Sequence, residues 1–382
     1  MNVSQAPKAR KRIVTPFNAS WRIQSYDADN LYPQHIRDMV AVSSTATTCL
    51  KRYAEFIEGN GIHSQLLADC VMNTAGETLD DIHHLVAQDK ATYNGFALHV
   101  NFDATLRVCD VHHVPFENCR LEEPDSEGNV AHVCVFPDWS GQSTRNGSRV
   151  KPSEDTIDRI CVFNPDPVVV AKQIEAAGGF DAYKGQILYC SGEGMRYPLA
   201  IFDAVLTEIA ADEGLSNVKL RNIRNNFLPS GAFVHYGSKE GEINEEIAKQ
   251  LADIQGDMNA CKMLNIEIEN VEEKPEFVTF PVANYDRTFE ATTNDVKDNI
   301  YSAFGQEGWL CVRNGKVGFG GEVIRDIEDQ YAKKCARVQR ELARAYMKIL
   351  SHATSGMLND IATPDALTIE PLTTIKTEGG EQ

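Results

Sequence analysis

The 382-residue sequence has no apolar run approaching the roughly 20 residues that a membrane helix needs. Its N-terminus also lacks the apolar stretch of a secretion signal, so we expect a cytoplasmic protein that does not contact membranes. The ten cysteines are scattered singly between Cys49 and Cys335, without the regular spacing of a disulfide framework. In a chain of this size, that distribution indicates reduced thiols in apolar cores.

Sequence motifs for nucleotide hydrolysis and acyl transfer are missing as well. No G-x-x-x-x-G-K-[ST] phosphate loop occurs, and the glycines of 318–321 neither follow a hydrophobic strand nor match G-x-G-x-x-G. Ser140 and Ser191 lack the spacing of a nucleophile elbow. We therefore predict a protein that is not an enzyme, with no catalytic residues and no cofactor.

Basic residues are in the minority. The chain has 37 Lys and Arg against 55 Asp and Glu, which gives a formal net charge of −18. Static nucleic-acid binders gain affinity from cations that displace condensed counterions, so this balance argues against such a binder. The acidic charge balance is compatible with a channel, because acidic walls with a few basic residues do not bind a sliding polyanion tightly. The hydrophobic content of 42% is ample for the cores of two or three domains.

One group of side chains has the composition of a metal site but not its spacing. It comprises Cys109, His112, His113 and Cys119, with His132 and Cys134 on an expected neighbouring strand. Structural zinc sites usually show two tight ligand pairs, and neighbouring strand residues such as His112 and His113 point to opposite faces. We interpret these as ordinary strand residues and predict no metal. The alternative is a metal-dependent hydrolase that uses Cys109, Asp110, His112 and His113.

The first half of the chain is predicted to be rich in strands. Residues 1–29 have the composition of a flexible arm with one basic cluster, Lys8, Arg10, Lys11 and Arg12. A helix that begins near Pro33 is expected to reach Ile57 and to end at Gly59 and Gly61. A second helical region covers 66–91, and strands are expected at 96–102, 106–111, 130–136, 157–163 and 186–189.

A helical pattern from Met195 to Phe227 is the most distinctive feature of the chain. Acidic residues lie in its first part and basic residues in its last part: Glu208, Asp212 and Glu213, then Lys219, Arg221 and Arg224. About 30 residues at 1.5 Å each make a shaft of about 45 Å. Polar groups spread along such a long helix are more typical of the wall of a passage than of a concave binding pocket.

A compact β-α-β pattern follows this helix. Strands are expected at 232–236, 263–268 and 277–280, with a helix over 243–261. A second long helix, 285–304, carries Asp286, Glu290, Asp295 and Asp298. Asp295 and Asp298 share a helix face, which we interpret as solvated. The last long helix, 322–352, has an apolar stripe.

Between these two helices lies a glycine-rich segment, 305–321. Glycines at 305, 308, 315, 318 and 320 predict a flexible backbone, and the segment exceeds the 2 to 8 residues that usually connect helices in bundles. It carries Trp309, Arg313, Asn314 and Lys316. We predict a mobile loop that touches a phosphate backbone transiently.

Three segments, in this order, carry a family resemblance. They are Asn30-Leu31-Tyr32-Pro33 with its helix and Gly59-Asn60-Gly61; Tyr197-Pro198-Leu199 leading to Asn225-Asn226-Phe227-Leu228-Pro229-Ser230-Gly231; and Ile300-Tyr301-Ser302-Ala303-Phe304-Gly305 with the helix after it. Over about 29–350, the chain resembles the portal proteins of tailed bacteriophages and related prophages.

The resemblance implies an α+β portal fold with a definite order of parts. These are a flexible basic arm (1–29), a β-rich wing (30–192), a first stem helix (193–227), a small α/β clip (228–284), a second stem helix (285–304), a tunnel loop (305–321), a long wing or tunnel helix (322–350) and a minimal crown or disordered tail (351–382).

The resemblance also implies a ring, usually of twelve subunits, at one capsid vertex of a virion assembled in the host cytoplasm. Double-stranded DNA is packaged and later ejected through such a ring, which contacts capsid or scaffolding protein and docks the terminase large subunit and then a head–tail adaptor. Another head–tail adaptor without a threaded channel is the remaining alternative.

The portal architecture assigns roles to particular residues. Candidates to line the channel are Glu208, Asp212, Lys219, Arg221, Arg224, Glu290, Asp295 and Asp298. Candidates to contact DNA from the tunnel loop are Trp309, Arg313, Asn314 and Lys316. Candidates to bind partners from the clip are Tyr236, Lys239, Glu245, Lys249 and Asp253.

Overall fold

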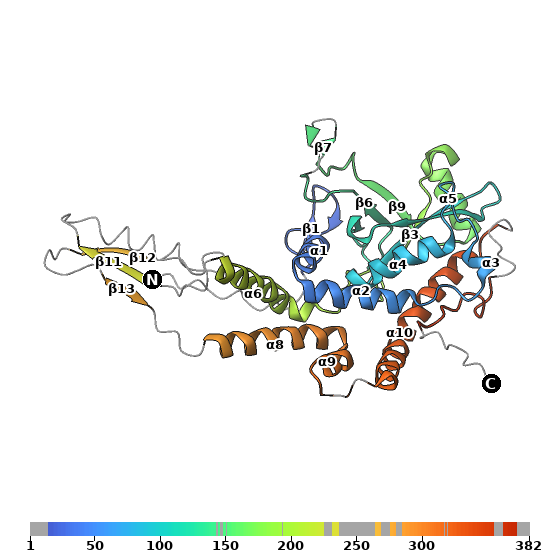
Figure 1. The fold of residues 1–382 in the computed structure, drawn as a ribbon. Helices are drawn as coiled ribbons and strands as arrows, with labels where there is room; N and C mark the ends of the chain where they lie inside the picture. Colours follow the sequence, from blue (N-terminus) through green and yellow to red (C-terminus); the bar gives the residue numbers. More distant parts are fainter. Residues whose placement is uncertain are drawn as a thin grey trace, which may run out of the picture. The chain divides into compact units, whose positions relative to one another are not determined.

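The computed structural model of the protein divides the chain into two units. Unit 1 comprises Met1–Asp38, Thr48–Asp203 and Phe304–Gln382, and unit 2 comprises Met39–Thr47 and Ala204–Ala303. The structure describes residues 14–142, 144–145, 148–149, 151–192, 194–224, 231–236, 264–268, 276–279, 285–316, 318, 320–354 and 362–372. Figure 1 labels the elements along the chain.

Unit 1 is built on a mixed sheet of eight strands in the order β1-β2-β5-β6-β9-β10-β3-β4. The strands are β1 (Phe17–Asn18), β2 (Ile23–Gln24), β3 (Phe96–Phe102), β4 (Val108–Val114), β5 (Cys119–Glu122), β6 (His132–Val135), β9 (Asp158–Val162) and β10 (Gln186–Cys190). Only β9 and β10 pair in parallel within this sheet. β7 (Thr144–Arg145) and β8 (Ser148–Arg149) form a separate hairpin.

The prediction of a flexible arm over 1–29 is wrong for its last part. β1 and β2 belong to the sheet, and Tyr26 is fully buried. The ring of Tyr26 stacks on Tyr32 and on Tyr197, with centroid distances of 5.1 and 4.0 Å. Aromatic packing therefore orders this segment. The basic cluster Lys8, Arg10, Lys11 and Arg12 lies outside the described residues.

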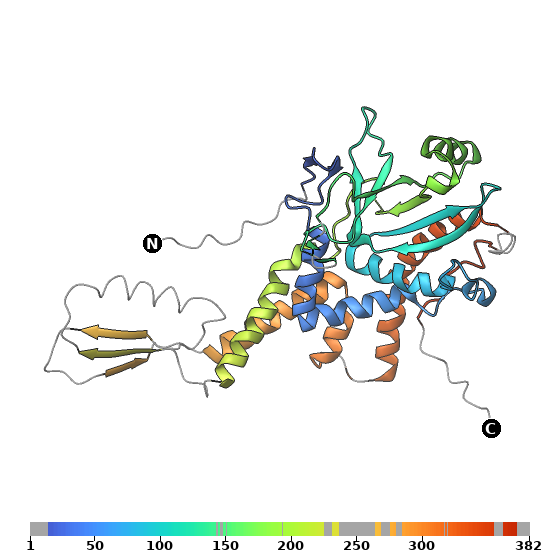
Figure 2. The same cartoon turned by 90° about the horizontal axis from the view of Figure 1, so that it is seen from above.

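The helices of unit 1 follow local sequence signals. α4 (Leu79–Tyr93) begins with a capping box between Thr78 and Asp81 and ends at Asn94 in the left-handed region. It packs against β3 and β4 (Figure 2). α5 (Pro167–Ala177) starts with Asp166 as N-cap and Pro167 at its first position. α3 (Gln65–Ala68) and the 3₁₀ turns η1 (Phe116–Asn118) and η2 (Phe180–Ala182) are short.

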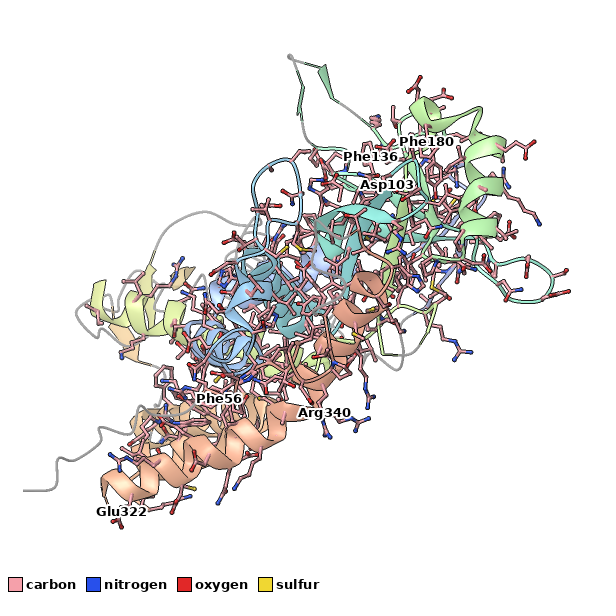
Figure 3. The ribbon with its side chains drawn as sticks, turned by 90° about the vertical axis from the view of Figure 1, so that its right-hand side faces the viewer. Phe56, Asp103, Phe136, Phe180, Glu322 and Arg340 are labelled. Atoms are coloured by element: carbon pink, nitrogen blue, oxygen red, sulfur yellow. The ribbon has the colours of Figure 1, made fainter. Side chains whose placement is uncertain are left out.

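α10 (Gly321–Leu350) confirms the last predicted helix and most of its apolar stripe. The buried members are Tyr331, Cys335, Leu342, Ala345 and Ile349. Arg340, labelled in Figure 3, lies on the exposed side of the same helix. None of the helices in the described part of the chain combines the length and apolar character that a bilayer span requires.

Two helices, α1 (Tyr32–Val42) and α2 (Ser44–Glu58), occupy the predicted first helical region and are separated at Ser43. α2 ends at the Gly59-Asn60-Gly61 motif, where Gly59 has φ 66° and the carbonyl oxygen of Glu370 leaves no space for a Cβ atom. Asn60 N donates to Glu370 O (2.8 Å). Leu367 and Ile369 are buried, so the predicted minimal crown or disordered tail (351–382) contains packed residues at 362–372.

Unit 2 contains α6 (Leu206–Arg224), the strands β11 (Gly231–Tyr236), β12 (Leu264–Ile268) and β13 (Glu276–Thr279), and α8 (Tyr285–Phe304) up to Ala303. The three strands form a sheet in the order β12-β11-β13, which confirms the predicted strands. The predicted helix 243–261 lies outside the described residues. In Figures 1 and 2, α6 and α8 run alongside each other. The fold class is α+β, as the sequence predicts.

The first long helix is shorter than predicted. It begins at Leu206 instead of Met195, after the single turn η3 (Asp203–Val205). Tyr197, Ala200 and Phe202 are buried and belong to unit 1. Tertiary contacts therefore override the helical pattern of this segment.

Candidate functional site

Arg120 on β5 is fully buried and is the centre of a hydrogen-bond network, the arginine hub. Nε donates to Asn30 Oδ1 (2.7 Å), and Nη2 donates to Asn30 O (2.6 Å) and to Gln34 Oε1 (3.3 Å). Nη1 donates to the carbonyls of Glu117 (2.9 Å) and Cys119 (2.8 Å). Burial lowers the pKa of Arg120, but a guanidinium stays protonated in proteins. Neutral oxygens therefore satisfy this buried charge.

The hub explains the Asn30-Leu31-Tyr32-Pro33 motif. Asn30 has φ 64°, a conformation that asparagine tolerates better than most residues. Its Oδ1 accepts from Tyr26 N (2.9 Å) as well as from Arg120. Tyr32 OH donates to Asp203 Oδ1 (2.7 Å) and accepts from Ala200 N (3.0 Å). The motif thus binds the residues that directly precede unit 2.

The second motif, Tyr197-Pro198-Leu199, joins the same cluster. Tyr197 OH donates to Gln24 O (2.5 Å) and accepts from Leu121 N (2.8 Å). Tyr26 OH donates to Pro198 O (2.5 Å). Burial raises the pKa of Tyr26 and of Tyr197, so both hydroxyls stay neutral donors. Two segments far apart in the sequence therefore meet around one arginine.

The chain leaves unit 1 after Asp203 and returns at Phe304; we call residues 204–303 the excursion. Phe202 stacks on Phe304 with a centroid distance of 5.0 Å and an interplanar angle of 21°. Tyr331 OH on α10 donates to Phe304 O (3.1 Å). The residues that flank the excursion on either side are therefore held together in the core of unit 1.

The third motif continues into the return segment. Gln306 is fully buried, and its Nε2 donates to Cys49 O (2.9 Å) and to Tyr331 OH (3.1 Å). Gly305 has φ 67°, which favours glycine at this turn. These contacts join the end of α8 to α2 and α10 within unit 1.

The predicted tunnel loop 305–321 contains a helix, which corrects the expectation of a loop throughout. α9 (Glu307–Arg313) ends in a Schellman motif: Gly315 has φ 68°, Lys316 N donates to Cys311 O (3.0 Å) and Gly315 N donates to Val312 O (3.1 Å). The glycine that suggested flexibility at 315 terminates a helix instead.

Trp309 does not lie on a movable segment, which corrects its predicted role. Its ring packs edge-on against Phe56 (5.7 Å) and Tyr331 (5.0 Å), and the Arg52 guanidinium lies 4.7 Å from its centroid. Trp309 thus holds α9 against α2 and α10. Arg313, Asn314 and Lys316, at the end of α9, are exposed.

Asp212 is buried in unit 2, which corrects its predicted place on a channel wall. It accepts from Ser43 Oγ (2.7 Å) and from Thr45 N (3.4 Å) at the start of α2. Ser43 Oγ in turn accepts from Ala46 N (3.1 Å). A carboxylate at a helix N-terminus satisfies otherwise unpaired N–H groups and interacts favourably with the helix dipole. Asp212 thus connects α6 to the α1–α2 junction.

The other predicted channel residues differ in exposure. Lys219, Glu290 and Asp295 are exposed, Glu208, Arg221 and Asp298 are half-buried, and the side chain of Arg224 lies outside the described part. Of the predicted clip residues, Tyr236 lies on β11 without a described side chain, and Lys239, Glu245, Lys249 and Asp253 lie outside the described residues.

Replacing Asp212 with alanine is expected to destabilise unit 2 by about 1 to 3 kcal/mol, because Ser43 Oγ and Thr45 N lose their buried acceptor. The shift in urea midpoint measures this cost. Asp295→Ala, an exposed carboxylate on α8, is the matched control and should change stability by less than about 0.5 kcal/mol. Equal effects of the two substitutions would contradict the role assigned to Asp212.

The histidines of the suspected metal group each bind their own carboxylate. His112 Nε2 lies 2.9 Å from Asp110 Oδ2, and His113 Nε2 lies 2.7 Å from Asp89 Oδ2 on α4. Within the described ranges, no three Cys, His, Asp or Glu side chains are placed to hold a metal ion. The geometry favours the interpretation of these histidines as strand residues with separate partners.

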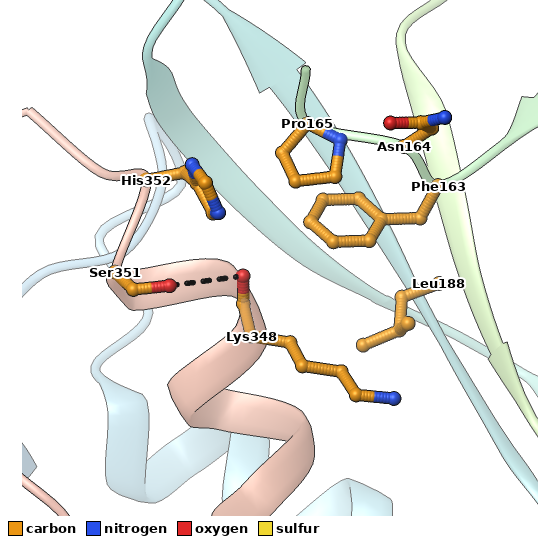
Figure 4. Close-up of a pocket in the computed structure, with 7 residues that line it drawn as sticks. All are labelled: Phe163, Asn164, Pro165, Leu188, Lys348, Ser351 and His352. Atoms are coloured by element: carbon orange, nitrogen blue, oxygen red, sulfur yellow. Dashed lines mark hydrogen bonds between the residues drawn. The ribbon is translucent and has the colours of Figure 1, made fainter.

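A cavity of about 380 Å³ lies between the end of α10, strand β10 and the segment that follows β9 (Figure 4). Its lining residues are Phe163, Asn164, Pro165, Leu188, Lys348, Ser351 and His352. Ser351 Oγ donates to the carbonyl of Lys348 (3.4 Å). The serine hydroxyl is thus bonded to backbone and not to His352, an arrangement unlike a nucleophile–base pair.

Several solved structures resemble this chain. The neck of a native gene transfer agent (GTA) particle, computed with C12 symmetry, is 16% identical, with 84% of this chain and 80% of that chain covered and a TM-score of 0.45. The virion of a native GTA particle is 16% identical, with 85% and 80% covered and a TM-score of 0.43. An HK97 family phage portal protein from Corynebacterium diphtheriae is 8% identical, with 70% and 75% covered and a TM-score of 0.33. No family model and no curated protein matches the chain.

Proposed function

We propose that this chain is the subunit of a phage portal, a ring at one capsid vertex through which double-stranded DNA is packaged and ejected. The excursion is the observation that carries the proposal. It consists of two long helices, α6 and α8, separated in sequence by the small sheet β11–β13, and the residues that flank it, Phe202 and Phe304, stack on each other. A stem helix, a clip and a second stem helix follow one another in the same order.

Charge on the proposed stem favours passive guidance of DNA. Glu290 and Asp295 are exposed on α8, and each would become a ring of negative charge in a closed assembly. Duplex DNA carries one charge per about 1.7 Å, so acidic rings oppose sticking. Arg313 and Lys316 at the end of α9 supply brief, sequence-independent phosphate contacts that resist backsliding.

The remaining partners follow from the same architecture. In the proposed assembly of usually twelve copies, the clip around β11–β13 docks the terminase large subunit and then a head–tail adaptor. The sheet of unit 1 forms the wing toward capsid or scaffolding protein. The subunit is assembled in the host cytoplasm, resides in the virion and performs no catalysis.

Negative-stain imaging of the purified chain tests the proposal. We expect rings with a central hole of about 20 to 40 Å, because a duplex whose major groove alone is about 12 Å wide has to pass. Compact single chains under all assembly conditions, or rings with no hole, would contradict a threaded channel.

A genetic experiment separates a portal from another head–tail adaptor. Capsids assembled without a portal should contain no packaged DNA, whereas capsids that lack only an adaptor should fill and then fail to join tails. DNA content of particles made without this chain distinguishes the two, and filled tailless capsids would favour the adaptor.

A further inference from the structure

Three polar side chains on neighbouring strands of the large sheet lie in one row: Glu122 on β5, His132 on β6 and Cys161 on β9. His132 is directly opposite Cys161 in the antiparallel β6–β9 ladder, and Glu122 follows the Leu121–Val133 pair of β5 and β6. Val162 N donates to Ala131 O, so the next pair, His132–Cys161, is of the non-hydrogen-bonded kind. In such pairs the two side chains are closest.

The imidazole of His132 is oriented by its carboxylate neighbour. His132 Nδ1 lies 2.6 Å from Glu122 Oε2, and Glu122 is buried. The other carboxylate oxygen of Glu122 accepts from Arg159 Nη1 (3.2 Å), which fixes its position. Glu122 therefore holds the imidazole through Nδ1 at the position where His132 lies opposite Cys161.

The surroundings of His132 favour its charged form. A hydrogen bond with Cys161, and a hydrogen bond and charge interaction with Glu122, outweigh desolvation and raise the pKa of His132 to about 9. The ring is therefore an imidazolium at neutral pH. An imidazolium next to a thiol stabilises the thiolate, which is the nucleophilic form of cysteine.

We propose that Cys161 is a reactive thiol and a site of covalent modification by low-molecular-weight disulfides and soft electrophiles. Cys161, His132 and Glu122 have the order of nucleophile, base and orienting carboxylate that activates cysteine elsewhere. In the step with a disulfide, the Cys161 thiolate attacks one sulfur and forms a mixed disulfide. The S–S bond of the reagent breaks, and its second sulfur leaves as a thiolate that takes a proton from water. Cys161 is oxidised and the leaving sulfur is reduced.

Most of the other described thiols lie in less favourable surroundings. Burial raises the pKa of Cys49, Cys119, Cys134, Cys190 and Cys335. Cys109 is more exposed than Cys161, but desolvation and the carboxylates of Asp103 and Asp110 raise its pKa. Cys109 is therefore an internal reference for the rate of modification. Its greater exposure favours faster reaction of Cys109, whereas the neighbouring imidazolium favours faster reaction of Cys161.

Competitive labelling of the folded, full-length chain tests the proposal. Limiting iodoacetamide or oxidised glutathione is added at pH 7, and modification of each cysteine is followed by peptide mass spectrometry. We expect Cys161 to react about tenfold faster than Cys109, and His132→Gln to slow Cys161 about tenfold while Cys109 is unchanged. At pH 10 an ordinary thiol is largely ionised and His132 is neutral, so the rate of iodoacetamide labelling at Cys161 should no longer depend on His132.

Two further variants keep the test decisive. Glu122→Gln retains a hydrogen-bond acceptor for His132 but removes the charge, so it should slow Cys161 at pH 7 in the same direction. His84→Gln, an exposed histidine on α4, is the matched control and should leave all rates unchanged. Faster labelling of Cys109 than of Cys161, or equal rates in wild type and His132→Gln at pH 7, would overturn the proposal. The outcome does not depend on ring formation.

Discussion

Replacing Arg120 with methionine is expected to destabilise unit 1 by at least about 3 kcal/mol, the scale of two hydrogen bonds to a charged group. Arg120 is fully buried and donates to five oxygen atoms, three of them backbone carbonyls. Methionine removes all five of these hydrogen bonds, and the carbonyl of Glu117 keeps its bond from Gln34 Nε2. Folding stabilities of about 5 to 15 kcal/mol make this a large fraction of the total. In a melting experiment the shift should reach about 6 to 12 °C.

Two other substitutions define what this result means. Arg37→Met removes an exposed guanidinium that pairs with Glu117, and exposed pairs contribute less than about 1 kcal/mol. Arg120→Lys keeps the charge but supplies fewer donors without the planar fork, so it should not restore stability. If Arg120→Met lowers the melting temperature no more than Arg37→Met does, the hub does not hold the motifs together.

The strands and long helices could be predicted from local patterns because their signals are local. β11 and β3 lie where alternation and apolar runs place them, and α10 keeps its 3.6-residue stripe over thirty residues. The resemblance also identified segments that matter, since Asn30 and Tyr197 meet at one cluster. The partner that joins them, Arg120, was not predicted, because a lone arginine in a four-residue strand has no periodic signal.

Elements that depend on distant residues were missed. Two-residue strands such as β1 and β2 have no pattern of their own and exist because β5 pairs with β2. Glycines at 308 and 315 suggested a loop, yet α9 forms because Trp309 packs among rings from α2 and α10. The surface position predicted for Asp212 failed for the same reason, since Ser43 lies far away in sequence.

The row of Glu122, His132 and Cys161 was not predicted from the sequence. His132 and Cys134 were noted for a metal-like composition but were interpreted as ordinary strand residues. Cys161 lies on a strand that pairs with β6 only in the folded sheet, and that pairing decides which side chains meet. Strand register, which depends here on tertiary contacts, thus decides that His132 lies opposite Cys161.

Replacing Arg313 and Lys316 together with alanine is expected to reduce DNA-filled particles at least about tenfold after a salt challenge. Removing one cation that neutralises a phosphate reduces the slope of the logarithm of the binding constant against the logarithm of salt concentration by about 0.9. In a ring, this reduction is multiplied by the number of subunits. Both side chains are exposed at the end of α9, so the fold should tolerate the change. DNA retained per capsid, measured over a range of salt concentrations, gives the result.

Lys333→Ala with Arg337→Ala is the matched control for this experiment, because it removes the same charge from exposed positions on α10. Particles with the control pair should retain DNA like wild type, since the proposed phosphate contacts belong to the segment after α9. Equal retention in all three chains would remove Arg313 and Lys316 from the mechanism, while rings with an open hole would still support the channel. A decrease in both double variants would instead indicate that total positive charge governs retention, and the specific role of the α9 end would be wrong.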